Sequence, residues 1–253
     1  MKQDQLLTTA LQIVSGCRTE RERAVAIHDF VRDRVRFGFT RHFDLASPDQ
    51  TLTAGLGHCN PQAQLFVALL GAVDISARLH FVTIDNRILD GCFPPGRGPG
   101  DRLSHAFSEV RLGGRWVRTD SYIADPQLAA AARPRLRAAG KTMGHGVHVH
   151  GTGQWDGRSD AFSQFADPAM ALADHGTFSS VAEFAATRHY RHRIGPIKMT
   201  TALRWLPGWL TRPLITRINR RIDQLRSDDA NAQGISRVDR AVEAGANEMQ
   251  PAI

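Results

Sequence analysis

Cysteine is scarce in this chain of 253 residues, and long apolar runs are missing from it. Its three cysteines, Cys17, Cys59 and Cys92, cannot all pair, and the chain has no charged-then-apolar leader of signal-peptide form. We therefore expect free thiols and a cytoplasmic location. The sequence contains no uninterrupted run of about 18 apolar residues, which excludes a membrane-spanning helix. With 42% hydrophobic residues, the chain can still bury a substantial core.

Acidic residues are almost absent near the C-terminus. Between Arg188 and Arg226, ten lysines or arginines stand against one acid, Asp223, and the whole chain has a net charge of +7. The remainder of the chain is therefore slightly acidic. The basic charge belongs to this one segment and says little about the rest of the protein.

Residues 196–226 combine this charge with Trp205 and Trp209, and their apolar residues predict an amphipathic helix. Two interpretations stay open for the basic surface of residues 197–226. It is either a peripheral anchor on anionic lipid at the inner face of the membrane, or a helical arm packed on the core or on a second subunit. No recognised motif supports a nucleic-acid partner. Residues 227–253 are polar with little periodicity, which predicts a disordered tail.

Cys59 has the sequence context of a reactive thiol. It lies in Gly55-Leu56-Gly57-His58-Cys59-Asn60-Pro61, directly before an apolar stretch at residues 65–70. Asn60 is a suitable helix N-cap and Pro61 suits the first turn, so the sulfur is expected at the positive end of a helix. The helix terminus and a neighbouring imidazole would favour thiolate over thiol. A buried structural cysteine is the alternative.

His105 and Asp120 are expected on one β-hairpin. Residues 103–112 and 115–122 read as strands around the two-residue turn Gly113-Gly114. In the register that this turn predicts, the numbers of paired residues sum to 227. His105 and Asp120 are then diagonal neighbours on one face, about 7–8 Å apart at the backbone. A carboxylate at that position can orient the imidazole toward a thiol.

Local patterns predict the other elements. Helices are expected over residues 1–15, from the capping box Thr19-x-x-Glu22 onward, and over 129–139. Residues 78–84 alternate as a strand does. Residues 36–48 read as a loop, and residues 162–184 as short helices.

The sequence resembles the transglutaminase-like superfamily of papain-fold cysteine enzymes over about residues 20–125. The matching text is Gly57-His58-Cys59, the stretch from His105 to Val110, Gly114-Arg115-Trp116-Val117 and Asp120. The resemblance implies an α+β fold, with the cysteine at a helix N-terminus packed on a mostly antiparallel sheet and with a C-terminal helical extension. It implies a catalytic domain over residues 1–195 and a Cys59-His105-Asp120 triad without a cofactor. No glutamine or tryptophan shortly before Cys59 offers a second oxyanion donor.

The chemistry expected of such a triad is attack on the amide carbonyl of a peptide or protein substrate, through a thioester acyl-enzyme. Hydrolysis by a peptidase or amidase is favoured, because aminolysis needs a dry acceptor tunnel. Amine transfer to protein glutamine, as in a transglutaminase, and a non-catalytic peptide-binding module are the alternatives. The sequence leaves the natural substrate and the oligomeric state open.

Four more residues are expected to contact substrate: His58, Asn60, Trp116 and Tyr122. For Trp116 the alternative is core packing. The histidines at 145, 148 and 150 invite a metal interpretation, since two of them would share a strand face. Zinc needs three or four ligands, and no cysteine or further carboxylate lies at a helpful spacing, so we expect no metal.

Overall fold

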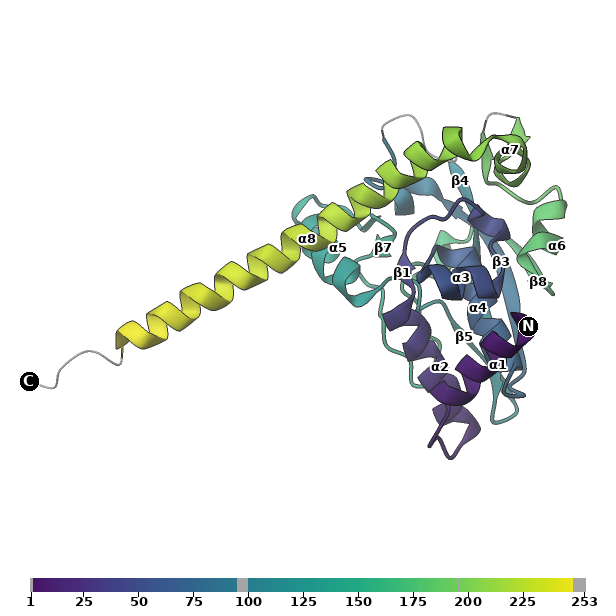
Figure 1. The fold of residues 1–253 in the computed structure, drawn as a ribbon, viewed down its shortest axis with the longest axis horizontal. Coiled ribbons are helices and arrows are strands. Elements are labelled where there is room, and N and C mark those ends of the chain that lie inside the picture. Colours follow the sequence, from purple (N-terminus) through teal and green to yellow (C-terminus); the bar gives the residue numbers. More distant parts are fainter. Residues whose placement is uncertain (1, 95–99, 195, 248–253) are drawn as a thin grey trace, which may run out of the picture.

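The chain is built around one antiparallel sheet. The computed structural model describes the backbone of residues 2–94, 100–194 and 196–247. Four strands lie in the order β5-β4-β3-β8, and α4 packs against β3 and β4 (Figure 1). The N-terminal helices α1, α2 and α3 pack in turn against α4. The predicted α+β class, with a mostly antiparallel sheet, is confirmed.

The elements follow in this order along the chain. The α-helices are α1 (Lys2–Ile13), α2 (Glu20–Arg34), α3 (Pro48–Ala54), α4 (Cys59–Gly71), α5 (Pro126–Ala138), α6 (Val181–Ala186), α7 (Met199–Trp205) and α8 (Gly208–Asn247). The sheet strands are β3 (Ala77–Asp85), β4 (Arg102–Leu112), β5 (Arg115–Thr119) and β8 (Ala173–Phe178). Short strands are β1 (Arg36–Phe37), β2 (Leu56–Gly57), β6 (Met143–Gly144), β7 (Val147–His148), β9 (Arg193–Ile194) and β10 (Ile197–Lys198), and the 3₁₀ helices are η1 (Phe43–Leu45), η2 (Asn86–Leu89) and η3 (Pro168–Met170).

The start of α2 is the capping box that the sequence predicts. The Thr19 hydroxyl accepts from the N–H of Glu22, and the Glu22 carboxylate accepts from the N–H of Thr19. Residues 36–48, predicted as a loop, contain β1 and η1 instead. β1 pairs in parallel with β2, so that Phe37 lies beside Gly57. This pairing brings the segment after α2 next to the start of α4.

The β4–β5 hairpin has the predicted register. Ser108 lies opposite Thr119 and Leu112 opposite Arg115, and each pair of numbers sums to 227. The ladder ends at Thr119, three residues before the predicted end of the return strand at residue 122. The N–H of Asp120 donates to the carbonyl of Ala161 instead. Asp120 is therefore the first residue beyond β5, and a later segment of the chain covers it.

The region predicted as short helices is only partly helical. It contains η3 and α6, but also β8, which pairs with β3 at the edge of the sheet. The register of this pairing shifts between Phe81 and Val82. The sequence of β8, Ala-Asp-His-Gly-Thr-Phe, has few β-branched or aromatic residues and a glycine, which is why its pattern does not indicate a strand.

The core lies between α4 and the sheet. The α4 side chains of Leu65, Phe66, Leu69 and Leu70 are fully buried, and Phe81 of β3 is buried among the same residues. Burial of such side chains stabilises a fold by about 1.5–3 kcal/mol each. The core therefore fixes α4, and with it the first helical residue, Cys59.

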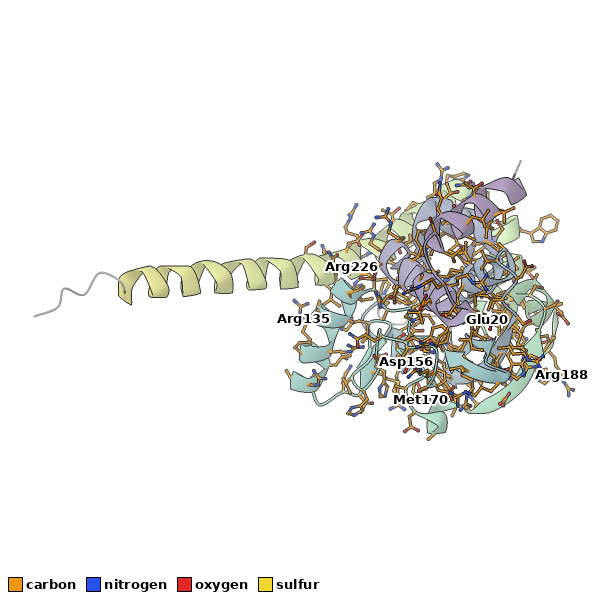
Figure 2. All side chains as sticks on the ribbon, turned by 90° about the horizontal axis from the view of Figure 1, so that it is seen from below. Glu20, Arg135, Asp156, Met170, Arg188 and Arg226 are labelled. Atoms are coloured by element: carbon orange, nitrogen blue, oxygen red, sulfur yellow. The ribbon has the colours of Figure 1, made fainter. Side chains whose placement is uncertain are left out.

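The C-terminal helix α8 packs on the body along its first half only. Ile218, Ile222 and Leu225 are buried in the core cluster, so the amphipathic helix was correctly predicted there. Arg226 lies at the point where α8 leaves the rest of the molecule (Figure 2). The helix then extends away from the body to Asn247 (Figure 1). This differs from the predicted tail from residue 227, because the stretch is rich in helix formers and lacks proline; residues 248–253 lie outside the described part.

Two side chains join α8 to the segment after α2. The Asn219 amide accepts from the N–H of Phe39 and donates to its carbonyl. The Arg226 guanidinium forms a buried ion pair with Asp125 and donates to the carbonyl of Phe37. Within the described residues, no helix combines the length and the apolar character needed to cross a bilayer.

Candidate active site

Cys59 is the first residue of α4. The helix N-cap is His58, in an extended conformation, and not Asn60 as predicted. Asn60 and Pro61 follow within the first turn, where proline's missing N–H is harmless. Gly57 allows close packing before the helix, because a Cβ there would meet Gln62 Cγ at 3.1 Å. The sulfur lies at the helix N-terminus, and the N–H of Cys59 belongs to the four that lack an intrahelical acceptor.

His105 and Asp120 form a fully buried pair. Nε2 of His105 lies 2.9 Å from Oδ2 of Asp120, and both side chains are 0% exposed. The predicted neighbouring positions on the hairpin are therefore correct. The pairing leaves Nδ1 of His105 buried and without a hydrogen-bond partner among the described residues. Leaving a buried nitrogen unpaired costs about 1–3 kcal/mol, so its position calls for an explanation, and a catalytic role is one.

Asp120 is held by the segment that covers it. Its Oδ1 accepts from the backbone N–H groups of Ser163 and Gln164, and its Oδ2 from that of Phe165 at 2.8 Å. The hydroxyl of Ser163 donates to the Asp120 carbonyl. Three backbone donors and one imidazole therefore surround this carboxylate. Backbone donors carry no residue signature, so these contacts could not be predicted from local motifs.

Cys59 and His105 line the same cavity. Its volume is about 20 Å³, enough for about one water molecule. The apolar walls come from Phe37, Phe39, Phe43, Ile84, Ile88, Leu89 and Leu103, and the polar lining from His58, Cys59, Ser104, His105, Gln164 and His192. The cavity is therefore small and mostly apolar, with a thiol and three imidazoles in its lining.

A second buried carboxylate, Asp44 of η1, lies beside the thiol. It is 0% exposed and accepts from Nδ2 of Asn60 at 2.7 Å and from the hydroxyl of Tyr190. It also bonds Nε2 of His58 at 2.8 Å and Nδ1 of His192 at 2.6 Å. Full burial acts to raise the pKa of Asp44, but the charges and hydrogen bonds of His192 and His58 bring it well below the usual range.

The network around Asp44 reduces the mobility of His58 and Asn60. Burial lowers the pKa of His58, opposed by Asp44, so the neutral imidazole is favoured. With Nε2–H donated to the carboxylate, Nδ1 is a hydrogen-bond acceptor. Nδ1 of His58 is also buried and unpaired within the described part of the chain. Asp44, Tyr190 and His192 come from distant segments, and the sequence analysis did not identify them.

The thiol is not the thiolate that the sequence predicts. Burial raises the pKa of Cys59 far above its usual value, and the charge of Asp44 raises it further. The backbone N–H groups of Ala106 and Asn60 act in the opposite direction without reversing the shift. In agreement, the Cys59 thiol donates to Oδ1 of Asn60 at 3.5 Å. Desolvation and a neighbouring anion therefore outweigh the helix terminus and favour the thiol over the thiolate.

Two of the predicted substrate contacts lie away from this cavity. Trp116 of β5 is 40% exposed and carries the Arg78 guanidinium 4.1 Å from its ring centre. Tyr122 is fully buried against Phe66, and its hydroxyl lies 2.8 Å from that of Ser108. His58 lines the cavity, and Asn60 bonds the thiol next to it. The structure thus brings together two of the four.

The histidine-rich loop does not gather ligands. Among the residues that the structure describes, no group of three or more His, Cys, Asp or Glu side chains is placed to hold a metal ion. His148 instead accepts from the N–H of His150 through its Nδ1.

Gln164 lines the cavity, and its amide donates to the carbonyl of Gly146. Gln164 lies far after Cys59 in the sequence, so the residues just before the cysteine give no indication of it.

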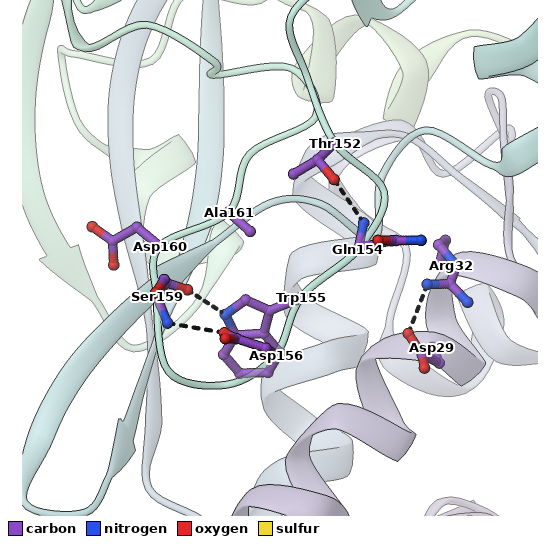
Figure 3. Close-up of a pocket in the computed structure, with 9 residues that line it drawn as sticks. All are labelled: Asp29, Arg32, Thr152, Gln154, Trp155, Asp156, Ser159, Asp160 and Ala161. Atoms are coloured by element: carbon purple, nitrogen blue, oxygen red, sulfur yellow. Dashed lines mark hydrogen bonds and ion pairs between the residues drawn. The ribbon is translucent and has the colours of Figure 1, made fainter.

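A larger, open hollow lies elsewhere on the surface. It measures about 640 Å³ and is lined by side chains between α2 and residues 152–161 (Figure 3). Its charged and polar groups are already paired: Arg32 with Asp29, and the Trp155 ring N–H with the Ser159 carbonyl. Neither Cys59 nor His105 reaches this hollow. It therefore offers no group to the chemistry of the thiol.

Two solved structures are similar to part of this chain. A solved structure of a candidate cysteine protease from Cytophaga hutchinsonii is 24% identical, with a TM-score of 0.36, over 46% of this chain and 36% of its own. A candidate protease from Parabacteroides distasonis is 15% identical, with a TM-score of 0.34, over 46% of this chain and 22% of its own. The chain thus spans well under half the length of either protein. A search of curated proteins gives no match.

The family comparison is more specific, because it covers the elements that carry the site. The core model of the transglutaminase-like superfamily matches residues 7–121, a range that runs from α1 through β5. It includes Cys59, His105 and Asp120, and its last matched residue directly follows the aspartate. The predicted resemblance is therefore confirmed: residues 7–121 form a transglutaminase-like core.

Proposed function

We propose that this protein is a cysteine-dependent acyl-transfer enzyme that hydrolyses amide bonds with Cys59, His105 and Asp120. One observation carries the proposal: Asp120 fixes His105 through Nε2, Nδ1 has no partner among the described residues, and His105 lines the same cavity as Cys59. A buried imidazole held in one tautomer by a carboxylate is the arrangement that a thiol nucleophile needs. The family match over residues 7–121 supports the same conclusion.

The reaction begins from a neutral thiol. As the Cys59 sulfur attacks the amide carbonyl carbon, its proton passes to Nδ1 of His105. The tetrahedral intermediate collapses with cleavage of the C–N bond, and the leaving amine takes the proton from His105. Water then attacks the thioester, giving a proton to His105, and cleavage of the C–S bond returns that proton to sulfur. Because the pKa of Cys59 is raised, deprotonation and attack belong to one step.

Two groups assist beside the triad. The N–H of Cys59, free at the helix N-terminus, is a donor for the oxyanion. Neutral His58 presents Nδ1 as an acceptor, so it suits the incoming water or amine better than the oxyanion. Asp44 holds His58 in this tautomer and is itself held by Tyr190 and His192. His58 therefore orients the second nucleophile, which explains why this histidine lines the cavity.

Amine transfer is the second candidate, and the apolar cavity favours it. Seven of the thirteen lining residues are phenylalanine, leucine or isoleucine, and a site that excludes water slows the competing hydrolysis. Hydrolysis is favoured over transfer, because the cavity has room for about one water molecule. A peptide-binding module would not need a buried imidazole with an unpaired nitrogen, so that alternative has the least support.

The test combines labelling with turnover. Full-length protein is treated with an acyl or epoxide probe, and a set of peptide amides is offered with and without an amine acceptor. We expect probe on Cys59, loss of labelling and turnover in Cys59→Ala and His105→Ala, and unchanged behaviour in the matched control Cys17→Ala. Turnover in Cys59→Ala would disprove the proposal. Amide product in the presence of amine, in place of acid, would replace hydrolysis by transfer.

A further inference from the structure

The junction of α7 and α8 carries large apolar side chains that contact little of the protein. Trp205 is 80% exposed and Trp209 72%, and three leucines beside them, Leu206, Leu210 and Leu214, are 40–48% exposed. We call these five residues the tryptophan surface. The junction lies at one end of the molecule, where α8 begins (Figure 1). Exposed apolar groups in one place mark an interaction site, whereas scattered ones do not.

The same region is basic. Arg212, Arg217, Arg220 and Arg221 of α8 are exposed, and none forms an ion pair with a side chain that the structure describes. No aspartate or glutamate occurs between Glu183 and Asp223. The charge next to the tryptophan surface is therefore positive and not compensated within its own segment.

The packing of α8 decides which way these groups face. Ile218, Ile222 and Leu225 hold one side of the helix against the core. Leu210, Leu214 and Arg221 follow at helical spacings along the flank next to this buried side. Trp209 and Arg220, eleven residues apart, lie on the side opposite Ile218, with Arg212 and Arg217 to either side of them. The outward half of α8 therefore carries a tryptophan among three arginines, and partly exposed leucines border it.

We propose that this outward face docks the protein on an anionic lipid surface, with Trp205 and Trp209 at headgroup depth. Tryptophans and leucines flanked by arginines, on a helix fixed parallel to the surface, match the way in which peripheral helices bind lipid. The complete lack of acids in the segment favours lipid over a protein partner, because a protein interface usually carries charges of both signs. The helix lies on the bilayer and does not cross it, consistent with its low apolar content.

The experiment uses full-length protein and two kinds of vesicle, phosphatidylcholine alone and phosphatidylcholine mixed with phosphatidylglycerol. We expect co-sedimentation with the mixed vesicles and release as salt rises, since the Debye length falls from about 10 Å at 0.1 M to about 3 Å at 1 M. The double variant Trp205→Ala, Trp209→Ala should partition about tenfold less or weaker still. Arg212→Gln with Arg217→Gln should lose roughly 25-fold, about fivefold for each arginine.

Matched controls change the same residue types elsewhere. Leu7→Ala with Leu11→Ala alters two exposed leucines of α1, and Arg34→Gln with Arg111→Gln removes two exposed arginines away from α8. Both controls should bind vesicles as the unchanged protein does. Equal loss in the controls would overturn the proposal. The proposal would also be overturned if the protein bound no vesicles and instead self-associated in sedimentation velocity, with the tryptophan variant abolishing that self-association. The tryptophan surface would then join two copies of the chain.

Discussion

Asp120 both orients His105 and accepts hydrogen bonds from the backbone of residues 163–165, so we expect Asp120→Asn to affect turnover and stability. The amide NH₂ of asparagine would replace either Oδ2, where it faces His105 and the N–H of Phe165, or Oδ1, where it faces the N–H groups of Ser163 and Gln164. In the first orientation, His105 must move its proton to Nδ1 to bond the amide, which removes the base. We expect a loss in turnover on the order of 10⁴-fold. We also expect a loss in stability of about 1–3 kcal/mol.

Both effects are measured on the same variant, by steady-state turnover and by urea unfolding. Asp160→Asn is the control, because it changes an aspartate of the same region that is partly exposed. A variant with normal turnover would show that Asp120 has no part in the chemistry. A variant with low turnover and unchanged stability would mean that the hydrogen bonds from the backbone of residues 163–165 stabilise the fold without the negative charge of Asp120.

The raised pKa of Cys59 gives a pH prediction. Iodoacetamide reacts with thiolate, so the labelling rate of Cys59 should be low at neutral pH and should rise with a midpoint above the usual thiol value of about 8.5. Asp44→Asn removes a neighbouring negative charge that disfavours the thiolate, so the midpoint should move to lower pH.

Peptide mapping with mass spectrometry reads the rate, and the peptide that contains Cys17 serves as the internal reference for the reagent. Circular dichroism checks that Asp44→Asn is folded, since Asp44 also bonds His58, Asn60 and His192. A midpoint below the usual thiol value in the unchanged protein would show a thiolate at rest. In that case the reaction would start from an ion pair.

At the scale of elements, the contact between α8 and β1 depends on Arg226. Its side chain pairs with Asp125 and donates to the Phe37 carbonyl, and both charged groups are almost completely buried. Arg226→Met would leave Asp125 buried with only its backbone donors, from Phe37 and Leu128. We expect destabilisation by about 3–5 kcal/mol.

The control Arg221→Met changes an exposed arginine of the same helix and should alter stability by about 0.5 kcal/mol or less. Chemical denaturation measures both. Phe37 lines the cavity, so Arg226→Met should also reduce turnover before it unfolds the protein. Equal stability of the two variants would mean that α8 is not part of the fold at this position.

Local signals explain which elements the sequence could predict. The β4–β5 register follows from the two-residue turn Gly113-Gly114, and the start of α2 follows from the reciprocal cap at Thr19. Both depend on residues within a few positions of each other. The edge strand β8 depends on pairing with β3, about ninety residues earlier. Such long-range pairing leaves no periodic pattern when the strand itself is polar.

The same distinction applies to the site. Cys59, His105 and Asp120 could be named because each lies in a local motif of a known family. Asp44 could not, since its partners come from two other segments of the chain, one with His58 and one with Tyr190 and His192. The effect of Asp44 on the pKa of the Cys59 thiol could therefore not be predicted either. The direction of the Cys59 pKa is decided by desolvation and by this carboxylate, neither of which is visible in the sequence around the cysteine.

At the scale of the whole molecule, the C-terminal region is part of the fold. Deleting residues 197–253 would remove Ile218, Ile222 and Leu225 from the core and expose the surface that they cover. It would also remove Asn219 and Arg226, which hold Phe39 and Phe37. Substitutions on the tryptophan surface therefore test lipid docking better than truncation does, because they leave the packed face of α8 intact.

The position of α8 also makes it a spacer. Asn219 and Arg226 of α8 hold the backbone of Phe39 and Phe37, two walls of the cavity, whereas Trp209 and Arg220 face away from the core. With the outward face on a bilayer, one helix diameter, roughly 10–12 Å, lies between the lipid headgroups and the body of the protein. An extended chain advances about 3.3 Å per residue, so a membrane-anchored substrate needs about three residues to pass α8 alone before it can approach Cys59. The enzyme would then select substrates by the height of the scissile amide bond above the membrane as well as by the side chains beside that bond.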